Sequence, residues 1–320
     1  MNGSKAKAYV ILSISTLIFG FSFIAGKTAL KAVNNDVFNL LSYRFIFASI
    51  ILTAIVLIRK HKISYKGKDK KNLILLCFFS PVLAFLFNAM GLSRISSFEA
   101  GLFVALIPVF TLMLNYLFFK EKITKLRLLF VIISIIGVFI INIFGLRQGE
   151  SSGLGRIFML IMVISVSLYL MYSIISSKEY SPMEITWTMM LVGAIIFSII
   201  AVTKNLINGT MNEYLGLIKN SSFLISVLYL AAGCSVIAYL GLNYSIPKLK
   251  VSIVAIFGNL TPIIAIFAGV IFLKESIYWY HILGSVVIIG GVLGASLLVN
   301  EPKEEQELIK ESKKSVVDSY

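Results

Sequence analysis

The chain has 320 residues, of which 58% are hydrophobic and only 14% are charged, and its mean hydropathy is +0.93. About a quarter of the residues in a soluble globular protein are charged, so this composition excludes that class and places most of the chain in lipid. The net charge of +14 does not indicate nucleic-acid binding, because the Lys and Arg residues lie between apolar runs and not on one amphipathic face.

Apolar runs of about 20 residues, the length that crosses a bilayer, recur along the chain. They predict ten transmembrane helices, at residues 8–26, 38–58, 72–92, 99–119, 127–145, 155–175, 183–203, 222–243, 251–273 and 279–299. The first run follows Lys5 and Lys7 as in a signal peptide, but it lacks a small-residue cleavage site, so we expect it to remain as an anchor. The connections are short, and residues 301–320 form a charged tail.

The distribution of basic residues predicts the orientation. Twenty of the 29 Lys and Arg residues fall on the side of the N-terminus and eight on the other side, while Arg44 lies inside a predicted span. Because Lys and Arg are enriched in cytoplasmic loops, we expect both termini in the cytoplasm of a multi-pass protein of the cell (inner) membrane.

An internal repeat becomes visible when the chain is shifted by 154 residues. Eleven of the 36 residues from 103 to 138 are then identical, and among the matches are Pro108 with Pro262 and Gly137 with Gly291. Since each repeat holds five helices, an odd number, the second half must be inverted in the membrane. The predicted fold is thus an all-α membrane protein with ten helices in two inverted five-helix repeats, at 1–146 and 147–300.

Three segments resemble the EamA type of the drug/metabolite transporter superfamily. They are 17–30 (LIFGFSFIAGKTAL), 40–48 (LLSYRFIFA) and 91–123, whose counterpart in the second half is 258–277 (GNLTPIIAIFAGVIFLKESI). The resemblance implies ten helices and the export or exchange of small metabolites. It also implies a central cavity that is lined mainly by the first, third, fourth, sixth, eighth and ninth helices.

Polar residues inside the spans recur at spacings of four or eight, which keeps them on one face of a helix. We predict a substrate site from these faces, with Asn88, Tyr169, Tyr172, Tyr239, Asn243 and Asn259. For each single residue the alternative role is an interhelical hydrogen bond, which stabilises a membrane protein by only about 0.6 kcal/mol on average.

Two pairs of residues are candidates for moving parts. Pro108 and Pro262 occupy matching positions inside helices, where a missing N–H and the ring disturb the hydrogen-bond ladder, so they are either hinges or static kinks. Arg44 is costly inside a span unless it is paired, hydrated or snorkelling, and Glu99 is the acid we name as its candidate partner in an outer gate. Snorkelling or structural bracing is the alternative for Arg44. Glu121 and Glu275 are interpreted as boundary charges, with a role as proton carriers as the alternative.

The favoured function is a secondary transporter that moves a small metabolite, with an amino acid or related compound as the preferred class, by alternating access. A quaternary amine or drug transporter of the same fold is the alternative, since Tyr and Phe rings bind cations. A membrane-embedded scaffold or enzyme is the competing class, although Cys77, Cys234, His61 and His281 form no reactive or metal-binding pattern. We expect no enzyme activity, no cofactor and no metal; the partners are the substrate and the bilayer, and a monomer is compatible with these features.

Overall fold

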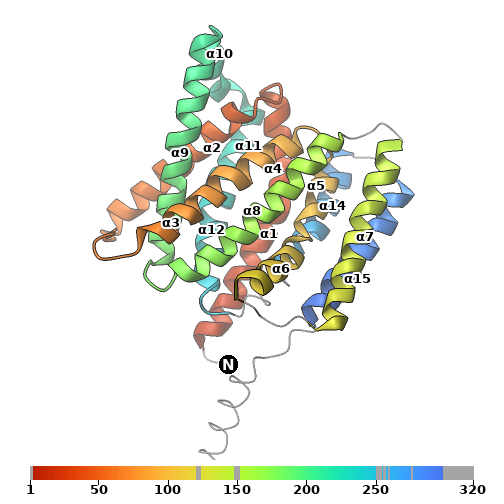
Figure 1. The fold of residues 1–320 in the computed structure, drawn as a ribbon. Coiled ribbons are helices and arrows are strands. Elements are labelled where there is room, and N and C mark those ends of the chain that lie inside the picture. The colour runs from red at the N-terminus through yellow and green to blue at the C-terminus, as the bar shows by residue number, and fades with distance from the viewer. Residues whose placement is uncertain are drawn as a thin grey trace, which may run out of the picture.

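The structure, a computed structural model, describes residues 3–119, 124–147, 152–249, 254, 257–258, 260–274 and 277–297. All secondary structure within these ranges is helical (Figure 1). In chain order the segments are α1 (Gly3–Ala32), α2 (Val37–Ile58), α3 (Lys70–Cys77), η1 (Phe78–Leu83), α4 (Ala84–Leu92), α5 (Ser97–Val104), α6 (Ile107–Phe119), α7 (Lys125–Arg147), α8 (Gly153–Ser176), α9 (Pro182–Ile207), α10 (Met211–Gly216), η2 (Leu217–Lys219), α11 (Ser221–Leu228), η3 (Tyr229–Ala238), α12 (Tyr239–Ser245), α14 (Leu260–Leu273) and α15 (Trp279–Leu297).

Six stretches of the described chain are long and apolar enough to cross a membrane. They are Lys5–Ala32, Val37–Ile58, Lys70–Leu92, Gly153–Ser176, Pro182–Ile207 and Ser221–Ser245. The segment predicted at 99–119 is split between α5 and α6. The predicted tail, residues 301–320, lies outside the described residues, as do Asn259, Glu121 and Glu275.

The outer surface of the bundle is apolar, as expected for a protein surrounded by lipid. Ile58 is 80% exposed and Ile207 is 79% exposed, and large apolar side chains on α7 and α15 also face outward. In water such a surface would drive aggregation, whereas hydrocarbon chains solvate it.

Polar caps fix where α2 and α9 begin. Asp36 accepts hydrogen bonds from the backbone N–H groups of Phe38 and Asn39, both at 3.2 Å, and thereby satisfies donors that the first turn of α2 leaves free. Ser181 and Glu184 form a reciprocal capping box at the start of α9.

The most extensive helix contacts join the two sequence halves. α7 packs against α15, α2 against α9, α1 against α14, and α4 against α8 (Figure 1). The contacts recur between equivalent helices when the first half of the chain is exchanged with the second. The contact of α1 with α14 is equivalent to that of α8 with α6, and the contact of α4 with α8 is equivalent to that of η3 and α12 with α1. The two halves therefore interlock instead of forming separate domains.

Glycines permit the closest of these approaches. A Cβ atom on Gly193 of α9 would lie 2.8 Å from the ring of Phe45 on α2, and one on Gly137 of α7 would lie 2.8 Å from the backbone nitrogen of Ile288 on α15. Because apolar burial does not drive helix association inside a bilayer, this close van der Waals packing is what holds the pairs together.

Candidate functional site

A cavity lies within the bundle and encloses about 900 Å³, including its opening. Its described lining comes from α1, α4, α5, α6, α8, α12 and α14, together with Val254 and Gly258. These are the parts of the chain that the resemblance implies for the cavity. Much of the wall is apolar, with Val104, Ile107, Met162, Val166 and Leu170.

The polar part of the wall is small and neutral. It consists of Ser15, Thr16, Ser22, Asn88, Tyr169, Tyr239 and Thr261. Among the described residues that line the cavity, none is Asp, Glu, Lys, Arg or His. The hydroxyls of Ser15 and Thr16 donate to carbonyl oxygens of their own helix, both at 2.9 Å, which leaves their lone pairs to act as acceptors.

Three of the six predicted site residues line this cavity: Asn88, Tyr169 and Tyr239. Tyr172 lies instead against Phe79, with parallel rings 5.7 Å apart. Asn259 is outside the described residues, although its neighbours Gly258 and Thr261 line the cavity.

Asn243 was predicted at the cavity, but the structure places it behind Tyr169. It is 1% exposed, and its Oδ1 accepts hydrogen bonds from Tyr169 Oη at 2.7 Å and Ser173 Oγ at 3.0 Å. Its Nδ2 donates to Thr186 Oγ1 at 3.0 Å. Asn243 therefore orients the Tyr169 ring that forms the wall and is not itself part of the wall.

Tyr239 is the centre of an aromatic cluster on one side of the cavity. Its ring centroid lies 5.3 Å from that of Phe19, 5.6 Å from that of Phe85 and 5.8 Å from that of Tyr169. Its hydroxyl is 3.4 Å from Ser80 Oγ, a long hydrogen bond. The rings of Phe19, Tyr169 and Tyr239 belong to the cavity wall, and the Phe85 ring packs behind that of Tyr239.

Arg44 and Glu99, considered together as a gate, have different partners in the structure. The Arg44 side chain donates from Nε to Ser235 Oγ at 2.9 Å and lies over the ring of Phe85, 4.4 Å from its centroid. Glu99 instead pairs with Arg156, Nη2 to Oε1 at 2.9 Å, and His281 Nε2 lies 3.7 Å from the same oxygen. The expected pairing of Arg44 with Glu99 is therefore corrected: packing of α5 on α8 brings a second arginine to the acid.

The profile of the EamA-like transporter family matches the chain twice, at residues 6–143 and 153–297. The chain belongs to the EamA-like transporter family. It is similar to the uncharacterized transporter YcxC of Bacillus subtilis (strain 168), with 29% identity over 92% of this chain and 94% of YcxC. An uncharacterized transporter of Archaeoglobus fulgidus is 23% identical over 89% of this chain and 97% of its own.

The fold of this EamA-like transporter also has a counterpart among solved structures. A protein of known crystal structure superposes with a TM-score of 0.64 and 15% identity, covering 93% of this chain and all of that one. Together with the apolar helices, the family identifies a multi-pass membrane protein whose general function is transport.

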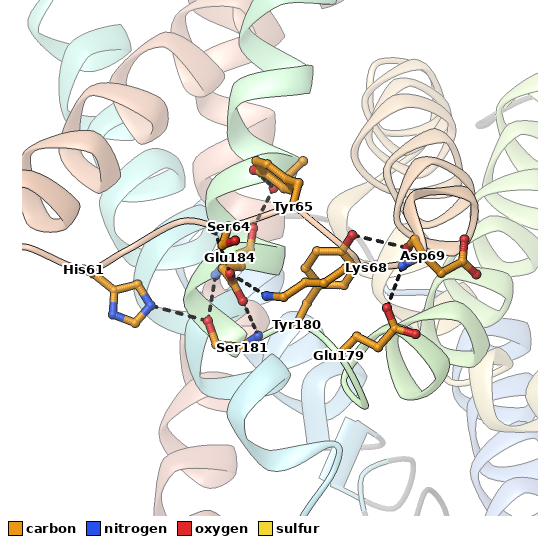
Figure 2. A network of polar contacts seen from close by, with 10 residues as sticks. His61, Ser64, Tyr65, Lys68, Asp69, Glu179, Tyr180, Ser181 and Glu184 are labelled. Atoms are coloured by element: carbon orange, nitrogen blue, oxygen red, sulfur yellow. Dashed lines mark hydrogen bonds and ion pairs between the residues drawn. The ribbon is translucent and has the colours of Figure 1, made fainter.

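One end of the transporter, here called the basic end, carries the loop 59–69. Figure 2 shows that this loop is bound to the turn between α8 and α9 by a polar network. Glu184 Oε1 accepts from Lys68 Nζ at 2.8 Å and from the Ser64 backbone N–H at 3.0 Å, and Glu179 Oε2 accepts from the Asp69 N–H at 2.6 Å. The network ties the two halves together at the basic end.

Tyr65 extends the same network. Its hydroxyl lies 2.7 Å from Thr188 Oγ1 on α9 (Figure 2). Burial raises the pKa of the Tyr65 phenol above its ordinary value, so the group stays protonated and neutral at physiological pH.

The helix break expected near the prolines lies just before Pro108. α5 ends at Val104 and α6 begins at Ile107, so Pro108 is the second residue of α6, where a missing N–H costs little. Pro262 is the third residue of α14. Pro108 thus occupies the first turn of a helix, and it lines the cavity.

Several residues of the site were not identified from the sequence. Ser15, Phe19 and Ser22 of α1 line the cavity, and their spacing of four and three was the signal for one helix face. Arg156 stands at the start of the span predicted at 155–175 and is 1% exposed. Its position at a predicted helix start on the same side as Glu99 was the only hint of the pair.

Proposed function

We propose that this protein is a secondary transporter that moves a small metabolite, with amino acids as the favoured class, by alternating access between its two halves. The observation that carries the proposal is the neutral, largely apolar cavity to which helices of both halves contribute. Such a cavity at the interface of repeats is where secondary transporters bind their substrates.

The proposed architecture has ten helices in two inverted repeats, 1–146 and 147–300, with both termini in the cytoplasm. It is supported by the duplicated family match and by the correspondence of helix contacts under exchange of the halves. In this proposal the network at the basic end holds the cytoplasmic side together and must open when the cavity faces the cytoplasm.

The size and chemistry of the cavity favour a small amphiphilic substrate. Its apolar wall suits a hydrocarbon side chain, and the hydroxyls and Asn88 offer hydrogen-bonding partners to a polar group. The aromatic cluster around Tyr239 favours a second candidate, a quaternary amine held by cation–π contacts.

Facilitated diffusion or exchange is favoured over obligate proton coupling. A proton carrier inside a membrane is normally an acid or histidine on the transport path, and the described lining of this cavity has neither. Flux should then be unchanged when a protonophore collapses the pH gradient.

Counterflow in proteoliposomes tests the proposal. The purified full-length chain is reconstituted with unlabelled leucine inside, and uptake of labelled leucine from outside is followed; choline replaces leucine in a parallel experiment. A carrier accumulates label transiently against its gradient, whereas a channel or scaffold does not. Uptake no higher than in protein-free liposomes for both compounds would contradict the proposal.

A pair of variants on α8 links any flux to the cavity. Val166 lines it, whereas Ile164 on the same helix is 38% exposed on the outer surface. Val166→Trp should fill the cavity and abolish counterflow, and Ile164→Trp should leave it unchanged at equal membrane levels. Equal flux in both variants would place the substrate path elsewhere.

A further inference from the structure

The Arg44 guanidinium is a buried cation in the middle of apolar surroundings. Arg44 is 7% exposed; in the described chain its Nε donates to the Ser235 hydroxyl and its guanidinium lies over the Phe85 ring, with the neutral Cys234 and Tyr239 nearby. One neutral hydroxyl and one ring do not balance a full charge in a low-dielectric interior. Among the described residues the terminal nitrogens Nη1 and Nη2, which form the planar fork of the side chain, have no hydrogen-bond partner and are left for another acceptor.

The described acidic residues are engaged elsewhere. Glu99 pairs with Arg156, Glu184 with Lys68, and Asp36 with Lys204 at 2.6 Å. Of the other described acids, Asp69 caps α3 and Glu179 binds the Asp69 N–H at the basic end, while Glu213 lies exposed on α10. Within the described ranges, Arg44 therefore has no carboxylate of the protein to pair with.

Arg44 lies one ring layer behind the cavity. The Phe85 ring beneath its guanidinium contacts the ring of Tyr239, which lines the cavity. Among the described residues, the Tyr239 hydroxyl has a single hydrogen bond, the long 3.4 Å contact to Ser80 Oγ. Rotation of the side chain away from its ring neighbours Phe19 and Tyr169 would open the way to Arg44.

Asn88 supplies an acceptor on the same helix as Phe85. It lies on α4 three residues after Phe85, and side chains at this spacing are neighbours on a helix surface, with Cβ atoms about 5–6 Å apart. Asn88 lines the cavity, and its Oδ1 is buried without a hydrogen-bond partner among the described residues. A buried acceptor without a donor is costly, and a ligand N–H group would satisfy it.

We propose that Arg44 binds the carboxylate of a zwitterionic substrate, an α-amino acid, while Asn88 Oδ1 accepts a hydrogen bond from its ammonium group. Tyr239 is the partition that moves aside, and the apolar side chain of the substrate lies in the wall of Val104, Met162 and Val166. The inference rests on the proposed transport function and assigns its substrate class. The guanidinium fork matches a carboxylate in bidentate geometry, and its charge repels a quaternary amine.

Competition against labelled leucine in counterflow tests the assignment. Leucine, leucinamide and 4-methyl-2-oxopentanoate share a side chain, but the amide lacks the carboxylate and the oxo acid lacks the ammonium group. We expect leucinamide to compete at least about 30-fold more weakly than leucine, since it leaves the buried Arg44 charge without its partner, which costs roughly 2 kcal/mol or more. The oxo acid should also compete more weakly than leucine, because it offers no N–H donor to Asn88 Oδ1. Choline should not compete.

Variants assign the discrimination to residues. In Arg44→Gln the ratio of leucinamide to leucine inhibition constants should fall to about 1, and Arg44→Lys should keep part of it because the charge remains. Asn88→Leu should reduce the discrimination against the oxo acid. Arg94→Gln, at an exposed arginine, is the matched control and should keep both ratios.

The outcomes separate the two proposals. If leucinamide competes as well as leucine in the unaltered protein, or if Arg44→Gln lowers the rate but keeps the ratio, Arg44 only braces the helices and the inference is wrong. If Arg44→Gln does not fold, the ratios in Arg44→Lys and Asn88→Leu decide in the same way. Counterflow of choline without leucine would leave a transporter but overturn the amino-acid assignment, and flux of neither would overturn the proposed function itself.

Discussion

Replacing Gly291 by Ala tests whether backbone contact between α7 and α15 holds the bundle together. A Cβ atom at Gly291 would lie 2.6 Å from the backbone nitrogen of Ser134 and 2.7 Å from the carbonyl oxygen of Phe130. Neither backbone atom can rotate away, so the helices must separate. The adjacent Gly290 is the control, because a Cβ there would meet nothing within 4 Å.

The two substitutions differ in packing alone. Each replaces a glycine inside a helix by alanine, and this replacement by itself stabilises the helix by roughly 0.5–1 kcal/mol. Overpacking at Gly291 costs typically about 1–3 kcal/mol. The free energy of unfolding of Gly291→Ala should therefore lie about 1–3 kcal/mol below that of Gly290→Ala, while Gly290→Ala should equal or exceed the unaltered protein.

Unfolding of the purified proteins in detergent measures the difference, and counterflow adds a functional readout. The contact between α7 and α15 lies away from the cavity lining, so the KM for substrate should be the same in both variants. Equal stability of the two variants would refute the packing argument. A changed KM in Gly291→Ala would show that this helix pair takes part in transport.

Three further predictions follow from other contacts. Pro108→Ala supplies an N–H that can bond to the carbonyl of Val104 and join α5 to α6. The transport flux should therefore fall more than the amount of protein in the membrane does, and the double variant Pro108→Ala/Pro262→Ala should have a lower flux still. Unchanged counterflow would show that the break is static. In a background without Cys77 and Cys234, Lys62→Cys should react with impermeant reagents only from the cytoplasm and Asn212→Cys only from outside, and the opposite pattern would reject the orientation. Asn243→Leu leaves the Tyr169 and Ser173 hydroxyls without their acceptor and should lower the free energy of unfolding by about 1–3 kcal/mol for each unsatisfied group. Tyr169→Phe should lower it less, because Ser173 still donates to Asn243 in that variant.

The membrane character and the family could be read from the sequence. Long apolar runs have few structural solutions in lipid, because each backbone polar group must be bonded within the chain, and a helix does this locally. The same local periodicity placed Asn88, Tyr169 and Tyr239 on faces that meet the cavity. These features depend on neighbours a few residues away.

Which helix each face meets was decided only by the tertiary structure. Asn243 had the right spacing, yet its face meets Tyr169, Ser173 and Thr186, and it became a buried hydrogen-bonding centre. Glu99 is 57 residues from Arg156, and nothing in the local pattern distinguishes that partner from Arg44. Partner choice between distant charges depends on how the two halves interlock, because a difference of one helix position exchanges an ion pair for an isolated charge in a low-dielectric interior.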